Sequence, residues 1–279
     1  MRVIIPMAGT GNRFVEKGYT DPKPLIKVNN KRIIEYILDM FNDDDTFIFI
    51  CNEDHLENTE MRSILTSLCP GATIVSMPTH KEGPVVTVKA AYDLIEDEEE
   101  VLVCYCDNPL LWDYENFKGY LENTDVDGCI LTHTGFHPHT LSDTKMAFLK
   151  IKEDLLEEIK EKECYTSQPM TEEASTGIYY FRNGKLLKTY FDKALEKELT
   201  YNGEYYVTLV YNLLVEDGLK VGYYTTPFVT VFGTPEEVEN FEAWTTILRG
   251  DQVKSTEQLN MCAMYWRGYH RECNIRGHR

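Results

Sequence analysis

The chain has 279 residues, and its 43% hydrophobic and 12% aromatic share can fill a sizeable core, which excludes a wholly disordered protein. Its 28 Lys and Arg against 46 Asp and Glu give a formal net charge of −18. Such a negative surface repels nucleic acids and anionic membranes, so we expect neither as a partner. An anionic small molecule would need a local pocket of basic side chains or backbone amides.

The sequence also excludes some classes of protein by what it lacks. It has no apolar run of about eighteen residues, so we expect no transmembrane helix. Several of its eight cysteines lie in hydrophobic runs, and their spacing matches no metal site. We therefore expect buried, reduced thiols and a cytoplasmic protein.

Strand and helix signals alternate through the first half of the chain. The apolar runs are continuous rather than alternating, which indicates strands buried on both faces, in a mainly parallel sheet covered by helices. The sequence therefore predicts an α/β layered fold. In chain order the predicted elements are strand Val3–Pro6, helix Ile33–Phe41, strand Thr46–Cys51, helix Met61–Leu68, strand Ala72–Met77, helix Pro84–Ile95 and strand Val101–Cys106.

The second half of the chain is less regular. Its charged stretch from Glu153 to Glu163 predicts a solvated hairpin or helix face. The tail after Arg249 turns basic, and a docked helix, an oligomer contact and a loose end all remain open for it. The predicted elements are strands Gly128–Thr132, Met146–Ile151 and Gly177–Phe181, helix Tyr205–Leu214 and strand Val221–Tyr224.

The most informative stretch is the glycine loop that follows the first predicted strand, within Pro6–Val28. Gly9 and Gly11 allow a sharp turn and a close approach of the backbone, whose amides can then face phosphate oxygens. Arg13 adds a planar fork that suits phosphate, and Lys23, between two prolines, adds a point charge. This combination predicts a polyphosphate site.

Two other glycine loops are disfavoured by the residues present. A dinucleotide-binding Rossmann loop needs a small residue where Phe14 stands. A P-loop needs Gly-Lys followed by Ser or Thr after Gly11, and this sequence lacks it. The loop therefore belongs to another type of phosphate site.

Gly9-Thr10-Gly11-Asn12-Arg13 and Pro22-Lys23-Pro24-Leu25, placed after a strand, resemble the motifs of the sugar-phosphate nucleotidylyltransferases, or pyrophosphorylases, which include small cytidylyltransferases of the phosphocholine type. The resemblance extends over roughly residues 1–245. It implies a Rossmann-like three-layer α/β/α fold with a mixed, mainly parallel sheet, of the nucleotide-diphospho-sugar transferase type. It also implies one domain over 1–248, with a nucleotide-binding part of about 1–125 and an acceptor-binding part of about 126–248. The tail 249–279 is then a helical segment or an oligomer contact.

The same resemblance assigns roles to residues of the nucleotide-binding part. Arg13 and Lys23 would stabilise the charge that develops at the α-phosphate and are the predicted catalytic residues. Asp107, at the end of the run VLVCYCD, would bind Mg²⁺, which prefers oxygen ligands and bridging phosphates; a capping role for Asp107 is the structural alternative. The predicted nucleotide-binding residues are Ala8, Gly9, Thr10, Gly11, Asn12, Arg13, Lys23, Glu82, Gly83 and Thr87.

On the acceptor side, the resemblance rests on Glu161-Lys162 and on the run Glu173–Phe181. The glutamate would bind acceptor hydroxyls and the lysine the acceptor phosphate, while a glycine would let the backbone approach the acceptor. The run NGEYYVT matches an acceptor-side region with less specificity. The predicted acceptor-binding residues are Glu161, Lys162, Thr176, Gly177 and Glu204.

One position departs from the family's pattern. Val231 stands where many members carry a second metal-binding aspartate, two residues before the glycine of a Gly-Thr-Pro turn. Either Asp107 and the phosphates hold the metal alone, or another carboxylate such as Glu236 helps, or the acceptor chemistry differs. His133, His137 and His139 lie close together in sequence and could bind a metal or an acceptor phosphate, but their spacing favours a loop over a metal site. A role in shaping the acceptor pocket also stays open for them.

These observations lead to one principal hypothesis, a Mg²⁺-dependent enzyme that transfers a nucleoside monophosphate from an NTP to a sugar 1-phosphate or similar phosphorylated metabolite. The implied setting is cytoplasmic carbohydrate biosynthesis, including capsule or surface polysaccharide, and a homo-oligomer stays open. Three alternatives remain. They are a cytidylyltransferase that uses CTP and a small non-sugar phosphomonoester, a nucleotide-sugar-dependent glycosyltransferase of related fold, and a non-catalytic nucleotide sensor.

Overall fold

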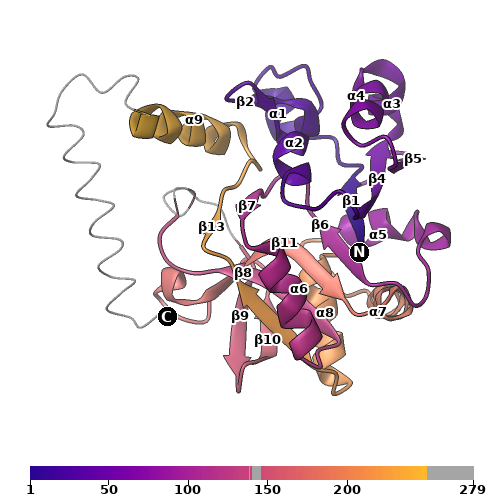
Figure 1. Ribbon diagram of the computed structural model, residues 1–279, viewed down its shortest axis with the longest axis vertical. Coiled ribbons are helices and arrows are strands. Elements are labelled where there is room, and N and C mark those ends of the chain that lie inside the picture. The colour runs from indigo at the N-terminus through magenta and orange to yellow at the C-terminus, as the bar shows by residue number, and fades with distance from the viewer. Residues whose placement is uncertain (138, 140–145, 250–279) are drawn as a thin grey trace, which may run out of the picture.

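A branched nine-stranded sheet forms the centre of the computed structural model, which describes residues 1–137, 139 and 146–249 (Figure 1). The predictions for the tail beyond Arg249 lie outside the described residues. So do two of the eight cysteines, Cys262 and Cys273. The six cysteines within the described part are free thiols; Cys51, Cys104, Cys106 and Cys129 are buried as expected, whereas Cys69 and Cys164 are only partly buried.

The strands of the first half pair in parallel, as their continuous apolar runs predict. They lie in the order β6-β1-β4-β5, and Val3 of β1 pairs with Phe47 of β4 on one side and Leu102 of β6 on the other. Their carboxyl ends therefore meet at one edge of the sheet. The bounds are β1 Arg2–Met7, β4 Thr46–Asn52, β5 Thr73–Met77 and β6 Val101–Cys104.

A long antiparallel strand, β11 (Glu173–Phe181), continues the sheet beyond β6 and makes it mixed. It pairs with β8 (Gly128–His133) and, at its start, with β9 (Phe148–Lys152), so the sheet branches there. Strand β12 (Val221–Thr225) adds to β8 in parallel. The second half of the chain thus completes the sheet begun by the first.

The charged stretch after residue 152 belongs to a hairpin, which is one of the two structures predicted for it. Strand β10 (Leu155–Lys160) pairs with β9 in antiparallel register. The turn between them places Glu153 and Asp154 at positive φ, 53° and 64°. Asp154 tolerates that conformation because its short polar side chain can bond locally.

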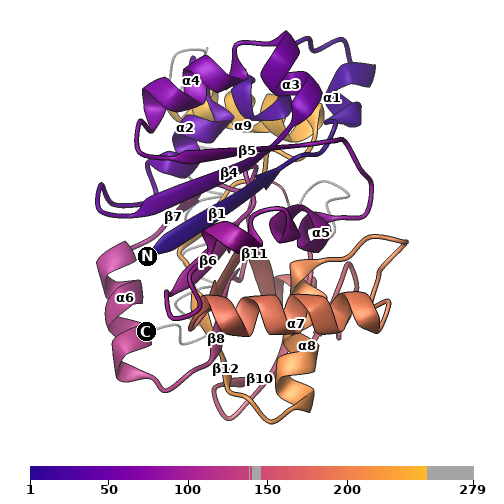
Figure 2. The same ribbon diagram turned by 90° about the vertical axis from the view of Figure 1, so that its right-hand side faces the viewer.

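Helices cover both faces of the sheet, which confirms the three-layer prediction. Val3 and Ile5 of β1 point into one core cluster and Ile4 into the other, as alternation along a strand requires. Figure 2 shows α2, α3 and α4 on one side of β1, β4 and β5, and α5 and α7 on the other. The helices with one core are α2 Ile33–Leu38, α3 Glu53–Asn58, α4 Met61–Leu68 and α6 Tyr114–Asn123; those with the other are α5 Pro84–Lys89, α7 Gly184–Glu196 and α8 Val207–Glu216.

Some predicted helices are too long. The expected helix Pro84–Ile95 ends at Lys89 and is followed by a 3₁₀ turn, Tyr92–Leu94. Ala91 and Ile95, on either side of this turn, are both buried in the core. No helix among the described residues is long and apolar enough to cross a bilayer.

The last described helix, α9 (Pro235–Arg249), returns from the second half of the chain to the first (Figure 1). Phe232 and Val238 pack with Phe14 of α1 (Asn12–Glu16) and with Ile33 in a third core cluster. This packing holds the segment around Gly233 close to the loop that follows β1.

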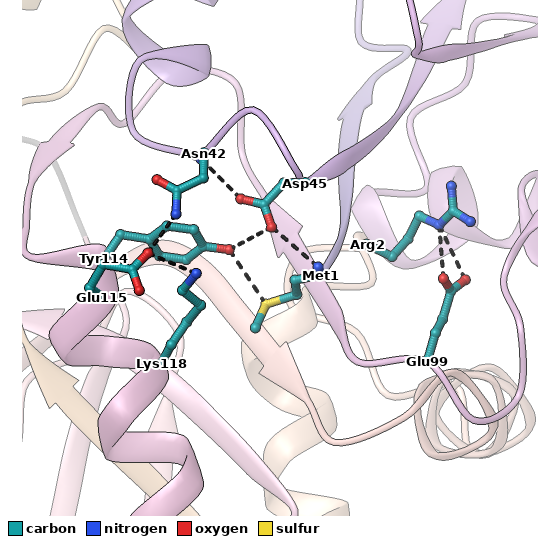
Figure 3. Close-up of polar contacts among 8 residues, drawn as sticks. All are labelled: Met1, Arg2, Asn42, Asp45, Glu99, Tyr114, Glu115 and Lys118. Carbon is teal, nitrogen blue, oxygen red and sulfur yellow. Dashed lines mark hydrogen bonds and ion pairs between the residues drawn. The ribbon is translucent and has the colours of Figure 1, made fainter.

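Polar contacts fix the amino ends of the parallel strands, at the edge of the sheet opposite their carboxyl ends (Figure 3). The Met1 amino group forms an ion pair with Asp45 at 3.2 Å, and the Tyr114 hydroxyl donates to Asp45 Oδ1 at 3.0 Å. Arg2 Nε bonds both carboxylate oxygens of Glu99. These ties set the relative positions of β1, β4 and β6.

Candidate active site

Two clefts meet at the carboxyl ends of the parallel strands. The first has a volume of about 520 Å³ and the second of about 650 Å³. They share the side chains of four residues, Tyr105, Asp107, Glu204 and Tyr206. Open α/β sheets bind their ligands outside the carboxyl ends of the strands, so this junction is the expected position for a site.

The glycine loop forms one wall of the first cleft, which Ala8, Gly9, Thr10, Gly11 and Asn12 all line. Gly11 has φ 67° and is the N-cap residue of α1, and the Phe14 amide donates to the Gly11 carbonyl at 2.9 Å. A side chain is disfavoured at this φ. Phe14 is 1% exposed and anchors the loop in the core, which explains a large residue where a dinucleotide-binding loop needs a small one.

Lys23 reaches the junction from a short 3₁₀ turn, Lys23–Leu25, and its ammonium donates a hydrogen bond to Asp107 Oδ2. Burial lowers the pKa of the Lys23 ammonium, but the charges of Asp107 and Glu237 and the hydrogen bond to Asp107 outweigh burial, so the pKa is raised overall. Lys23 is therefore cationic at neutral pH, with carboxylates around it.

Arg13 does not lie in the cleft where a residue that contacts the triphosphate is expected. It is exposed on α1 and lines the second cleft, together with Lys162, and is not among the residues that line the first. The structure therefore places one predicted catalytic cation in each cleft. Arg13 thus lies among the charged side chains of the second cleft, which contains the predicted acceptor-binding residues Glu161 and Lys162.

The predicted base-recognition turn pairs with the backbone of Tyr205. Gly83 has φ 96°, and a Cβ on it would lie 2.8 Å from both the nitrogen and the oxygen of Tyr205. Tyr205 also donates from its amide to the Glu82 carbonyl at 2.7 Å. The close approach that requires glycine is thus to the chain itself, and Glu82 does not line the first cleft.

Beside this turn, Thr87 and His80 both line the first cleft. Thr87 Oγ1 lies 2.9 Å from His80 Nε2. No sequence signal pointed to His80, because an isolated histidine in a loop matches no motif.

Glu161 and Lys162 lie side by side in the second cleft but in different surroundings. Glu161 is 8% exposed and accepts a hydrogen bond from Thr208 Oγ1 at 2.6 Å. Burial raises the pKa of the Glu161 carboxyl; the Thr208 hydrogen bond and the Lys162 charge oppose this, and Glu204 adds to it. Lys162 has φ 58°, in the left-handed region, and its side chain lines the second cleft.

The Lys162 ammonium is held by two aromatic rings. It donates to the Tyr206 hydroxyl at 2.6 Å and lies 4.5 Å from the centre of that ring, with the Tyr201 ring at 5.5 Å. Such cation–π contacts stabilise the charge without neutralising it. Tyr206, the N-cap residue of α8, and Tyr201 were not predicted, since no sequence motif marks either of them.

Of the remaining predicted acceptor residues, Glu204 and Gly177 line the second cleft and Thr176 does not. Thr176 is fully buried, and its hydroxyl donates to the Leu131 carbonyl at 3.0 Å. A Cβ on Gly177 would lie 2.8 Å from Asn108 Nδ2, so this glycine makes room for a side chain of the cleft itself.

Several carboxylates surround the predicted metal position. Asp107 follows β6 and lines both clefts, and Glu236 and Glu237 line the second. Val231 lies in the wall of the second cleft and is 5% exposed. No group of three or more His, Cys, Asp or Glu side chains in the described ranges is arranged to hold a metal by itself.

The three histidines form a buried cluster away from both clefts. The rings of His133, His137 and His139 lie 4.4 to 5.6 Å apart, and none lines either cleft. Burial lowers the pKa of His137 to about 4 and of His139 to about 3. Burial, followed by the charges of His137 and His139, also lowers the pKa of His133. All three are therefore neutral near pH 7, which suits a packed core better than a phosphate contact.

Comparison with known proteins identifies a family. The sequence matches the MobA-like NTP transferase domain over residues 3–168. It is 28% identical over 230 residues to the bifunctional protein GlmU of Clostridioides difficile strain 630. The matched region covers 79% of this chain and 46% of that protein. The chain spans about half the length of the curated relatives it matches.

Solved structures share the fold at low sequence identity. A nucleoside-diphosphate-sugar pyrophosphorylase from Vibrio cholerae RC9 superposes with a TM-score of 0.69 at 21% identity, over 86% of this chain and 99% of that one. The inositol-1-phosphate CTP transferase from T. maritima superposes with a TM-score of 0.66 at 14% identity, over 88% and 96%. The three-layer fold is thus that of the pyrophosphorylases.

Proposed function

Because more than half of its residues match that family, this chain belongs to the MobA-like NTP transferase domains, and we propose that it transfers a nucleoside monophosphate from an NTP to a phosphorylated small molecule. In this proposal the first cleft, built mainly from about residues 1–125, holds the NTP. The second cleft, built mainly from about residues 126–248, holds the acceptor.

The observation that carries the proposal is the junction of the two clefts at Asp107, with Lys23 on one side and Arg13 and Lys162 on the other. An oxygen of the acceptor phosphate attacks the α-phosphorus of the NTP in line. The new P–O bond forms as the bond from the α-phosphorus to the bridging oxygen breaks, and pyrophosphate leaves with that electron pair. No nucleophile of the protein is needed, because the acceptor phosphate is ionised at neutral pH.

The protein's contribution is then electrostatic and positional. Lys23 lies beside the glycine loop and would contact the polyphosphate. Lys162, already restrained by Tyr206 and Tyr201, would bind the acceptor phosphate with little further loss of side-chain freedom. Each cation lowers the repulsion between two anions that must come within bonding distance.

The proposal includes Mg²⁺. Proteins bind this ion through one or two carboxylates together with substrate phosphates, and Asp107 offers a partly exposed carboxylate that lines both clefts. Bound there, the ion would neutralise phosphate charge and fix the geometry of the polyphosphate. Asp107 would hold the ion through its carboxylate, in place of the hydrogen bond that it now accepts from Lys23.

For the acceptor we propose a sugar 1-phosphate. Glu161 and Glu204 present carboxylate oxygens that accept hydrogen bonds from hydroxyl groups. A quaternary ammonium such as that of phosphocholine needs open aromatic faces, and Lys162 already covers those of Tyr206 and Tyr201. Such an enzyme would act in cytoplasmic carbohydrate biosynthesis, such as that of capsule or surface polysaccharide.

The test is pyrophosphate release from a panel of the NTPs, each with sugar 1-phosphates, inositol 1-phosphate and phosphocholine, with and without Mg²⁺. We expect release that requires one NTP, one sugar 1-phosphate and the metal together. Release only with CTP and phosphocholine would show that the acceptor is phosphocholine and not a sugar 1-phosphate, while the proposed type of reaction would stand. A glycosyltransferase or a nucleotide sensor would release no pyrophosphate with any pair, and that result would overturn the proposal.

A further inference from the structure

Glu237 is a buried carboxylate of the site to which the proposed function assigns no role. It belongs to the first turn of α9, yet it is 5% exposed and lines the second cleft beside Asp107. Around Gly233, the point that a Cβ would occupy lies 3.1 Å from Glu237 Oε2 and 3.7 Å from Asp107 Oδ2. Two carboxylates of distant chain segments thus converge on one small volume.

A cation of the protein already lies at these carboxylates. The Lys23 ammonium bonds Asp107 Oδ2, and the charge of Glu237 also acts on it. Two carboxylates this close repel each other unless a positive charge lies between them. The arrangement therefore has the charge pattern of a cation site that a side-chain ammonium fills.

An independent observation comes from Asn108, which lines the same cleft. Asn108 is 9% exposed, and its Oδ1 has no hydrogen-bond partner among the residues that the structure describes. A buried acceptor without a donor calls for a water or an ion. Mg²⁺ keeps several bound waters when it binds proteins, and such a water can donate to this oxygen.

We propose that Glu237 is the second carboxylate of the divalent cation site, with Asp107 as the first and Asn108 Oδ1 as the acceptor of a metal-bound water. The inference rests on the proposed function for the identity of the cation. It assigns to Glu237, rather than to its exposed neighbour Glu236, the role of helping Asp107. Two carboxylates agree with the absence of any three-ligand group among the described residues.

Glu237 also has a structural role, which the test must separate from metal binding. The Thr234 amide donates to Glu237 Oε2 at 2.8 Å, and the Glu237 amide donates to Thr234 Oγ1 at 3.3 Å, which is a capping box. Glutamine serves in a capping box as well, so Glu237→Gln keeps the helix start while it removes the charge. Glu236→Gln is the matched control one residue away.

The measurement is the binding of Mn²⁺ alone, followed by the loss of the electron paramagnetic resonance signal of the free ion. It uses the full chain with Lys23→Met, which removes the competing ammonium. No NTP or acceptor is present, so the result does not depend on whether the protein releases pyrophosphate. Melting temperatures of all variants check that each is folded.

We expect Lys23→Met/Glu237→Gln to bind Mn²⁺ at least about tenfold more weakly than Lys23→Met. Lys23→Met/Glu236→Gln should change the affinity by less than about threefold, because Glu236 is exposed and its charge is screened. Equal affinities for the two double variants would overturn the proposal.

A rescue variant decides between lost metal binding and a disturbed helix start. Val231 Cγ1 also lies 3.7 Å from the Gly233 Cβ point, so Val231→Asp places a new carboxylate at the same volume. Added to Lys23→Met/Glu237→Gln, it should restore Mn²⁺ affinity to within about threefold of Lys23→Met. A loss that Val231→Asp does not restore would assign the effect to the helix cap and overturn the proposal.

Discussion

The Lys23 ammonium donates a hydrogen bond to Asp107 Oδ2 across 84 residues of chain, and this contact joins the turn after the glycine loop to the tip of β6. Both side chains are only partly exposed, at 18% and 21%. Without ligands each neutralises the other. In the proposed mechanism Lys23 would contact the polyphosphate and Asp107 would hold the metal, so the binding of one ligand would favour the binding of the other.

The first prediction concerns the cations of the junction. Lys23→Ala and Arg13→Ala should each lower the turnover number by about 10²–10³, as for the loss of one preorganised donor to a developing charge. Initial rates of pyrophosphate release measure this. Lys27→Ala, which removes an exposed lysine of β2 (Lys27–Val28), should leave the rate unchanged. Folded Lys23→Ala and Arg13→Ala proteins with wild-type turnover would show that the roles are wrongly assigned.

A second prediction separates the two clefts. Lys162→Ala should lower kcat/KM for the phosphorylated acceptor about 10- to 100-fold, since a charged hydrogen bond contributes about 1.5–3 kcal/mol. The shift in melting temperature caused by the NTP alone should stay as in the wild type. Lys150→Ala, an exposed lysine of β9 paired with Glu157, is the control. A loss of NTP binding in Lys162→Ala would place this lysine in the nucleotide cleft instead.

Tyr206 gives a third prediction, because its ring and its hydroxyl contact the same ammonium. Tyr206→Phe keeps the ring below Lys162 and removes the hydrogen bond, whereas Tyr206→Leu removes both. We expect the KM for the acceptor to rise modestly in the first variant and further in the second, with cation–π loss of about 0.5–2 kcal/mol separating them. Identical KM values for the Tyr206→Phe and Tyr206→Leu proteins, both folded, would show that the ring does not position Lys162.

The pH dependence of stability tests the surroundings of Glu161. Burial raises the pKa of this carboxyl in the folded protein above its value in the unfolded chain, although the Thr208 hydrogen bond and Lys162 oppose it. The free energy of unfolding of the wild type is therefore highest below the pKa that Glu161 has in the unfolded chain. It falls as the pH rises through the pKa that Glu161 has in the folded protein. Relative to it, Glu161→Gln should melt at an increasingly higher temperature between about pH 4 and neutral pH, and at the same temperature near about pH 4. A difference independent of pH would contradict this.

Gly83 provides a prediction about the turn beside the first cleft. Gly83→Ala must adopt φ 96° and bring its Cβ to 2.8 Å from the Tyr205 backbone, so we expect a loss of unfolding free energy above the roughly 1–3 kcal/mol of strained backbone alone. Gly18→Ala is a matched control, because Gly18 has φ 89° and a Cβ there meets no atom within 4 Å. Chemical denaturation measures both. Equal losses would mean that the Tyr205 backbone moves aside without cost.

The layers of the fold were accessible from sequence because they depend on local patterns. Continuous apolar runs such as Val3–Pro6 and Val101–Cys106 predicted buried parallel strands; the first run lies within β1, and the second contains β6. The end of α5 at Lys89 and the insertion of β11 between β6 and β8 were not predicted, since each depends on packing with distant segments.

The family was also accessible, because its motifs lie in one short stretch around Gly9 and Lys23, and the family match confirms that resemblance. The assembly of the site was not. The Lys23–Asp107 contact, the rings around Lys162 and the approach of Glu237 to Asp107 all join residues far apart in sequence. Thr176 looked like a ligand next to Gly177, but strand alternation turns it into the core.

The most direct test of the central claim follows the oxygen atoms of the acceptor. A sugar 1-phosphate labelled with ¹⁸O in its phosphate is incubated with the matching NTP and Mg²⁺, and mass spectrometry measures the ¹⁸O content of each product. If the acceptor phosphate attacks the α-phosphorus across the junction of the two clefts, the nucleotide-sugar retains all of the label and the pyrophosphate carries none. Label in the pyrophosphate, or an unlabelled nucleotide product, would contradict this account.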